Sequence, residues 1–298
     1  MSNPVPLTVE TTLAPGRRLV RFDRIEAELT ETPDRLALFQ DRGFRQRLFS
    51  ALDARIGPDG LLSLDVFDTL LLRDGSSELR RFVEIGERMA ACAKHRLAPA
   101  DCFLARHLGT RASYRAGPRV DGCREGSLTE IHATAARLLG IADHVAERFV
   151  EAELEYEATR LLPNRLLLDY VRRHRALGGQ VVLVSDMYMH ADQITRLLSR
   201  CGVTEAAYDA IYSSADTKVS KASGGIFALV REAGKCGHVL HVGDSLRGDY
   251  QRPRDAGWEA MLLPVPRRLL QERRRDHDAC LAELQSDHGL RLEGEIAA

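Results

Sequence analysis

The chain has 298 residues, which is enough for about two domains of ordinary size and a sizeable buried core. Its 42 Lys and Arg nearly balance its 43 Asp and Glu, and the net charge of −1 excludes a broad positive field that would attract nucleic acid or an anionic membrane. No apolar stretch is long enough for a signal peptide or a membrane span, so we expect a cytoplasmic protein. Six cysteines without C-x-x-C spacing favour reduced thiols over a zinc site or disulfides.

The first predicted unit is a partly helical N-terminal extension over residues 1–57, and Gly and Pro residues mark its end. It is followed by "LLSLDVF", a short and mainly apolar run from Leu61 to Phe67. Such a run favours a strand that is buried on both faces, as in a parallel sheet. Asp65 would then lie at the carboxyl end of this strand.

The next segment, from Ser76 to about Leu162, has helical periodicity and contains no convincing strand. Ser127 and Glu130 have the spacing of a capping box that begins one of its helices, and Gly140 is placed to end that helix. We therefore predict an inserted helical domain over residues 79–164.

From residue 165 onward, strand-like and helix-like segments alternate. An amphipathic helix is predicted within 162–179, closed by Gly178 and Gly179. It is followed by strands at 180–185, 210–214, 238–244 and 258–264, with helices at 191–202 and 224–234 among them. This alternation predicts right-handed crossovers and an α/β fold with a doubly wound, Rossmann-like parallel sheet. Residues 58–78 and 165–268 would form this core, and 269–298 a C-terminal helix and tail.

Polar residues end three of the predicted strands, namely Asp65, Ser185 and Asp244. Ligands of doubly wound sheets bind beyond the carboxyl ends of the strands, so these residues should share one crevice. With Asp249 nearby, three carboxylates would repel one another by roughly 4 kcal/mol per close pair, which a cation relieves. All-oxygen ligation favours Mg²⁺. Ser185 and Lys221 would suit an anion in the same crevice.

These residues together resemble the four motifs of the haloacid dehalogenase superfamily. The chain resembles it over roughly 61–73 and 165–265, and the helical segment corresponds to an inserted cap. The matching residues are an Asp nucleophile with a Thr four positions on (Asp65, Thr69), a strand-ending Ser (Ser185), a Lys before a helix (Lys221, with Lys218 as the rival) and G-D-x-x-x-x-D (Gly243, Asp244, Asp249).

The resemblance implies attack by Asp65 on phosphorus, an aspartyl-phosphate, and its hydrolysis by water. It also implies a set of Mg²⁺ ligands, namely Asp65, the Phe67 carbonyl, Asp244 and Asp249. The phosphate would be bound by four residues, namely Thr69, Ser185, Asp186 and Lys221. The partner is accordingly a small phosphorylated molecule, without nucleic acid or membrane, and the oligomeric state stays open.

The chain departs from the phosphatase pattern at Phe67, where these enzymes have a second Asp that protonates the leaving group. Asp68 stands one position further on, where Gly is usual, and is either a stand-in acid or a residue that caps the turn. The run "DVFDTLL" is similar to a little-characterised branch of hydrolases that includes proteins joined to glycosyltransferase domains, which suggests a sugar phosphate. Two alternatives are hydrolysis at carbon by the same Asp and a non-catalytic phosphate-binding protein. His241 is interpreted as a core residue.

Overall fold

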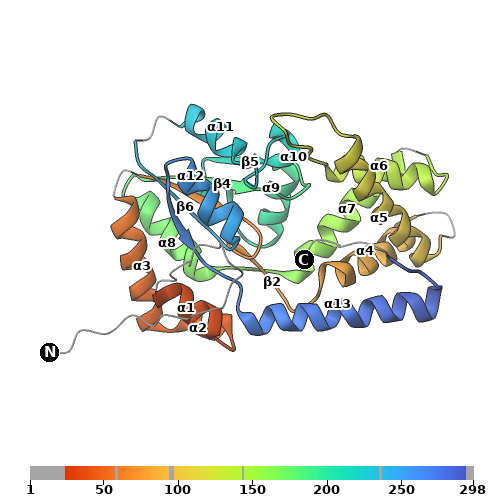
Figure 1. Ribbon diagram of the computed structural model, residues 1–298, viewed down its shortest axis with the longest axis horizontal. Coiled ribbons are helices and arrows are strands. Elements are labelled where there is room, and N and C mark those ends of the chain that lie inside the picture. Colours follow the sequence, from red (N-terminus) through yellow and green to blue (C-terminus); the bar gives the residue numbers. More distant parts are fainter. Residues whose placement is uncertain (1–23, 58–59, 94–96, 143, 235–236, 293–298) are drawn as a thin grey trace, which may run out of the picture.

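The computed structural model describes residues 24–57, 60–93, 97–142, 144–234 and 237–292, and Figure 1 shows its course. Five strands form a parallel sheet in the order β5-β4-β1-β6-β7. In chain order they are β1 (Leu61–Asp65), β4 (Gln180–Ser185), β5 (Ala210–Ser213), β6 (Val239–Gly243) and β7 (Glu259–Leu262). The predicted doubly wound α/β fold is confirmed. Residues 1–23 of the expected N-terminal extension lie outside the described residues.

Helices cover both faces of this sheet, which explains why its central strand is apolar. Leu62 and Leu64 of β1 join a cluster that includes side chains of three helices, α3 (Arg42–Ile56), α8 (Arg165–Ala176) and α9 (Ala191–Arg200). Leu61 points the other way, into a second cluster with Phe227 of α11 (Gly225–Ala233) and Trp258. All five residues of β1 are buried. None of the described helices is long and apolar enough to cross a membrane.

The helical cap consists of four helices, α4 (Glu78–Cys92), α5 (Pro99–Ala116), α6 (Leu128–Leu138) and α7 (His144–Arg160). Two short antiparallel strands, β2 (Leu71–Arg73) and β3 (Leu161–Pro163), connect it to the sheet. The sequence did not indicate this ribbon, because three-residue strands are too short for a recognisable period. Ser127 caps α6 as predicted, but the capping box is incomplete because Glu130 accepts a hydrogen bond from Ser113 instead.

Helix α13 (Arg267–His288) joins the core to the cap, and Figure 1 shows it running from the N-terminal helices α1 (Arg24–Glu31) and α2 (Arg35–Gln40) to α4. Asp276 accepts a hydrogen bond of 2.8 Å from the Ser77 amide at the start of α4. Arg273 donates two hydrogen bonds, of 2.8 and 2.9 Å, to the buried carboxylate of Asp68. Arg273 therefore fastens α13 to the turn that follows β1.

We predict that Arg273→Met lowers the free energy of unfolding by about 1.5 to 3 kcal/mol, because the buried Asp68 carboxylate loses its two hydrogen bonds to Arg273 and keeps those from Arg35 and the Arg73 amide. Arg274 lies next to it and is exposed, so Arg274→Met is the matched control and should change stability by less than about 0.5 kcal/mol. Urea denaturation of both variants tests this. Equal losses of stability would show that the ion pair to Asp68 is unimportant.

Candidate active site

Three neighbouring strands bring the predicted polar residues to one edge of the sheet. Asp65 ends β1 and lies opposite Val184 of β4, so Ser185 ends the adjacent strand one residue beyond it. Asp244 follows β6, which pairs with β1 on the other side. Asp65, Asp244 and Asp249 each contribute one carboxylate oxygen to a cluster in which all three oxygens lie within 4.8 Å of one another. The sheet thus brings these carboxylates together at one edge.

Lys221 is the buried cation of this crevice. Its Nζ donates hydrogen bonds of 2.5 Å to Asp65 Oδ1 and 2.6 Å to Asp249 Oδ1. Lys218, the rival for this role, instead lies 3.9 Å from Glu130 of the cap. The geometry therefore favours Lys221 as the lysine of the site.

The side chain of Asp186 binds the loop that carries Lys221, and its predicted contact with a phosphate stays a prediction. Its carboxylate oxygens accept hydrogen bonds from the backbone amides of Lys221, at 2.7 Å, and Ala222, at 3.2 Å. A carboxylate engaged in this way fixes the loop that carries the lysine, and its negative charge would repel a phosphate. Asp186 is thus a positioning residue for Lys221.

Asp249 is held from three directions. Its Oδ1 also accepts a hydrogen bond of 3.0 Å from His241 Nε2, and its Oδ2 accepts one of 2.9 Å from the Ser245 amide. A Cβ at Gly243 would lie only 2.3 Å from Asp249 Cγ, so the glycine allows this close approach. Because His241 Nε2 donates to the carboxylate, its Nδ1 accepts from Ser63 Oγ at 2.7 Å.

His241 is therefore more than the core histidine that its apolar neighbours indicated. It is fully buried and connects Ser63 of β1 to Asp249, and so to Lys221 and Asp65. Eight residues separate His241 from Asp249, with a strand end and a turn between them. No simple periodicity relates two such positions, so the sequence offered no signal for this contact.

The electrostatics of the crevice reflect three carboxylates around one lysine, a formal charge of −2 when all are ionised. Burial, reinforced by Asp249 and opposed by Lys221, raises the pKa of Asp65 to about 7. Burial and the neighbouring carboxylates likewise raise the pKa of Asp244 well above its ordinary value. The pKa of Lys221 is also raised, because Asp249 and Asp65 outweigh the effect of burial, so it stays charged.

The residues of the crevice fit a magnesium ion. They offer only oxygen ligands, which Mg²⁺ prefers, and a divalent cation would balance the formal charge of −2. Asp65 Oδ2 is buried and has no hydrogen-bond partner among the described residues. The Phe67 carbonyl likewise accepts no hydrogen bond in the part of the chain that the structure describes. Asp65, Asp244, Asp249 and this carbonyl could therefore hold the ion.

Two hydroxyl groups complete the crevice. Ser185 Oγ is buried and accepts a hydrogen bond of 3.2 Å from the Met187 amide. Thr69 Oγ1 is buried without a hydrogen-bond partner among the described residues, although it lies close enough to Asp65 to lower the pKa of that carboxyl. Both hydroxyls could donate to an anionic oxygen.

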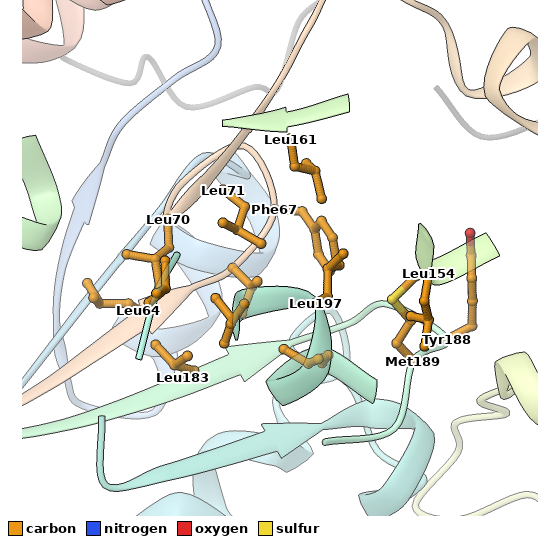
Figure 2. Close-up of a cluster of buried hydrophobic side chains, with 14 of the residues drawn as sticks. Leu64, Phe67, Leu70, Leu71, Leu154, Leu161, Leu183, Tyr188, Met189 and Leu197 are labelled. Atoms are coloured by element: carbon orange, nitrogen blue, oxygen red, sulfur yellow. The ribbon is translucent and has the colours of Figure 1, made fainter. Parts of the chain in front are cut away.

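Phe67 fills the position of the missing acid with an apolar ring. In Figure 2 the ring lies beside Leu71 and Leu161, in the same cluster as Leu154 of the cap. Only 6% of Phe67 is exposed, and the guanidinium carbon of Arg73 lies 4.6 Å from the ring centroid. Phe67 therefore packs between core and cap and has no side-chain proton to donate.

Asp68 does not have the surroundings expected of a substitute acid. Arg273 and Arg35 both bind its carboxylate, with Arg35 Nη2 at 3.2 Å. Burial alone would raise the pKa of Asp68, but Arg273, Arg73 and Arg35 lower it to about 2. Its φ of 59° explains why Gly is usual at this position, since Asp is one of the few other residues that tolerate it. The structure therefore favours the role of a turn residue.

The chain is similar to several solved structures, all at low sequence identity. No family model and no curated protein matches the chain. Among solved structures, it is 14% identical to a 2-haloacid dehalogenase from Pseudomonas syringae, over 68% of this chain and 86% of that one, with a TM-score of 0.47. It is 16% identical to L-2-haloacid dehalogenase from Xanthobacter autotrophicus, over 63% and 71%, with a TM-score of 0.40.

A provisionally named β-phosphoglucomutase from Thermotoga maritima is 18% identical, over 71% of this chain and 90% of that one, with a TM-score of 0.41. Likenesses at this level assign no activity.

Proposed function

We propose that this protein is a Mg²⁺-dependent hydrolase that cleaves small phosphorylated molecules through Asp65. The observation that carries the proposal is the state of Asp65, which is buried at a strand end and bound by Lys221 through Oδ1, while its Oδ2 has no hydrogen-bond partner among the residues that the structure describes. A carboxylate in this position is fixed, desolvated and ready to attack. The oxygen-rich surroundings suit both a metal ion and a phosphoryl group.

In the proposed reaction, a carboxylate oxygen of Asp65 forms a bond to phosphorus while the bond from phosphorus to the leaving oxygen breaks. Lys221, Ser185 and Thr69 hold the phosphoryl oxygens, and Asp249 and Asp186 keep Lys221 in place. Water then attacks the phosphorus of the aspartyl-phosphate and restores the Asp65 carboxylate. Magnesium, when bound, supplies charge that shields the repulsion between the carboxylate and the phosphoryl group.

The replacement of the acid by Phe67 narrows the substrates that suit this site. A general acid contributes about 10² to 10⁴ in rate, and its absence matters most when the leaving oxygen is strongly basic. We therefore propose substrates whose leaving group departs without a proton. The sugar phosphate that the resemblance suggests would be slow unless its leaving group is a weak base.

We predict that aryl and acyl phosphates are hydrolysed much faster than alkyl phosphates, because Phe67 cannot protonate the leaving group. Phe67→Asp should raise turnover of alkyl phosphates by up to about 10² and change that of aryl phosphates little. The measurement is Mg²⁺-dependent phosphate release across a series of leaving groups, plotted as log rate against leaving-group pKa. The melting temperature of each variant serves as the folding control, since Phe67 is buried.

Asp68→Asn tests whether the neighbouring carboxylate, that of Asp68, protonates the leaving group. It should leave the slope of the plot unchanged, because an aspartate with a pKa near 2 is ionised at neutral pH and has no proton to give. A slope that steepens in Asp68→Asn would assign the acid role to Asp68. If the wild type and Phe67→Asp are folded and bind Mg²⁺ but hydrolyse no phosphate ester, hydrolysis at carbon or a binding role replaces the proposal.

We predict that Mg²⁺ binds with a stoichiometry of one and that Asp244→Asn weakens its binding at least tenfold, since the variant removes one of three carboxylates. Titration calorimetry measures both affinities. Asp101→Asn, at an exposed position in the first turn of α5, is the charge-matched control and should bind as the wild type does. Equal affinity in the wild type and Asp244→Asn would refute the assignment.

We predict that Mg²⁺ affinity falls as pH is lowered below 7, by up to about a hundredfold per unit, because the metal must displace protons from both Asp65 and Asp244. The same linkage affects stability. Since the pKa of Asp65 is raised from 3.8 to about 7, the metal-free folded state loses stability as pH rises through this range. Mg²⁺ should therefore raise the melting temperature more at pH 8 than at pH 6, and an equal rise would contradict the prediction.

A further inference from the structure

Arg73, at the end of β2, lies over the residues that follow two active-site strands. Its guanidinium carbon is 4.6 Å from the ring centroid of Phe67, and its Nη2 donates to Met187 Sδ at 3.4 Å. Phe67 is two residues beyond Asp65, and Met187 is two residues beyond Ser185. The guanidinium therefore lies beyond the carboxyl ends of β1 and β4, between the crevice and the ribbon that leads to the cap.

Among the described residues, the guanidinium of Arg73 forms no ion pair with a carboxylate. No carboxylate lies within 4.0 Å of it in the described part of the chain, and its Nε is buried without a hydrogen-bond partner. A thioether is a weak acceptor. The nearby carboxylates serve other arginines, since Asp68 binds Arg35 and Arg273 and Glu157 binds Arg81. A mostly buried cation with free donors is costly unless an anion meets it.

We infer that Arg73 receives the leaving oxygen as an anion and so replaces the proton that an acid would give. The inference rests on the proposed function. In an in-line displacement the leaving oxygen departs on the side of phosphorus opposite Asp65, away from the strand ends and toward the ribbon that carries Arg73. The fork of a guanidinium binds a carboxylate or a phosphate through two parallel hydrogen bonds.

This role points to a substrate class. Acyl phosphates release a carboxylate and phosphoanhydrides release a phosphate, and both leave as anions that suit a guanidinium without any proton transfer. When the bond between phosphorus and the leaving oxygen breaks, the bonding electrons stay on the leaving oxygen. If the released anion later takes up a proton, that proton comes from water. An aliphatic alcohol would leave as a strongly basic alkoxide, which a fixed positive charge stabilises less completely than a proton does.

The experiment measures Mg²⁺-dependent phosphate release from acetyl phosphate and a series of aryl phosphates. Arg73→Met, which keeps the length of the side chain but not its charge, should lower kcat by about 10² to 10³, the usual effect of losing one donor to a developing anion. The plot of log rate against leaving-group pKa should also steepen. Arg111→Met, at an exposed arginine of α5, is the charge-matched control and should behave as the wild type.

Chemical rescue separates this role from a structural one. In Arg73→Ala, millimolar guanidinium chloride should restore part of kcat, whereas sodium chloride at equal ionic strength should not, and Arg73→Lys should be intermediate. Melting temperatures and Mg²⁺ affinities show that each variant is folded.

A folded Arg73→Met or Arg73→Lys with the rate and slope of the wild type overturns the inference alone. A lost rate that guanidinium does not restore and that leaves the slope unchanged also overturns it, because Arg73 would then act on structure. A wild type that releases no phosphate from any of these compounds refutes the proposed function, and the inference with it.

Discussion

The buried contact between Lys221 and Asp65 is the interaction on which the rest of the site depends. Parallel strands deliver carboxylates to one edge of the sheet, and without a cation at their centre these groups could not stay ionised together. Lys221 provides one positive charge, and its position is set by Asp186 at its backbone and by Asp249 at its side chain. The three carboxylates carry a formal charge of −3 when ionised, and Lys221 neutralises one of these charges. Two positive charges therefore remain to be supplied from outside the chain.

The surroundings of Lys221 extend deep into the sheet. His241 and Ser63 lie on neighbouring strands and form hydrogen bonds beneath Asp249, where polar groups are costly unless they are fully paired. Phe227 and Trp258 pack around the imidazole and hold it in place. Hydrogen bonds thus run from Ser63 through His241, Asp249 and Lys221 to Asp65, and they link the geometry of the site to the packing of the core.

The sequence predicted the parts of the site that obey local rules. A short apolar run with an aspartate at its end identifies a strand and places its last side chain, so Asp65, Ser185 and Asp244 were brought together as expected. The turn at Asp68 depends on Arg35 and Arg273, which lie 33 and 205 residues away in the chain. Neither arginine differs from its surface neighbours in the sequence. Contacts of this kind, like that between Ser63 and His241, arise only once tertiary packing has placed the segments.

The contact between Arg273 and Asp68 also bears on the order in which the site forms during synthesis of the chain. At synthesis rates of about 5 to 20 residues per second, the 205 residues between Asp68 and Arg273 separate their appearance by roughly 10 to 40 s. The strand of Asp65 and the helices of the cap are therefore complete well before the helix that fastens the turn between them. During that interval the carboxylate of Asp68 can be bound by Arg35 and by the Arg73 amide, both of which are made early. The crevice reaches its final form late, when α13 closes over a fold that is otherwise finished.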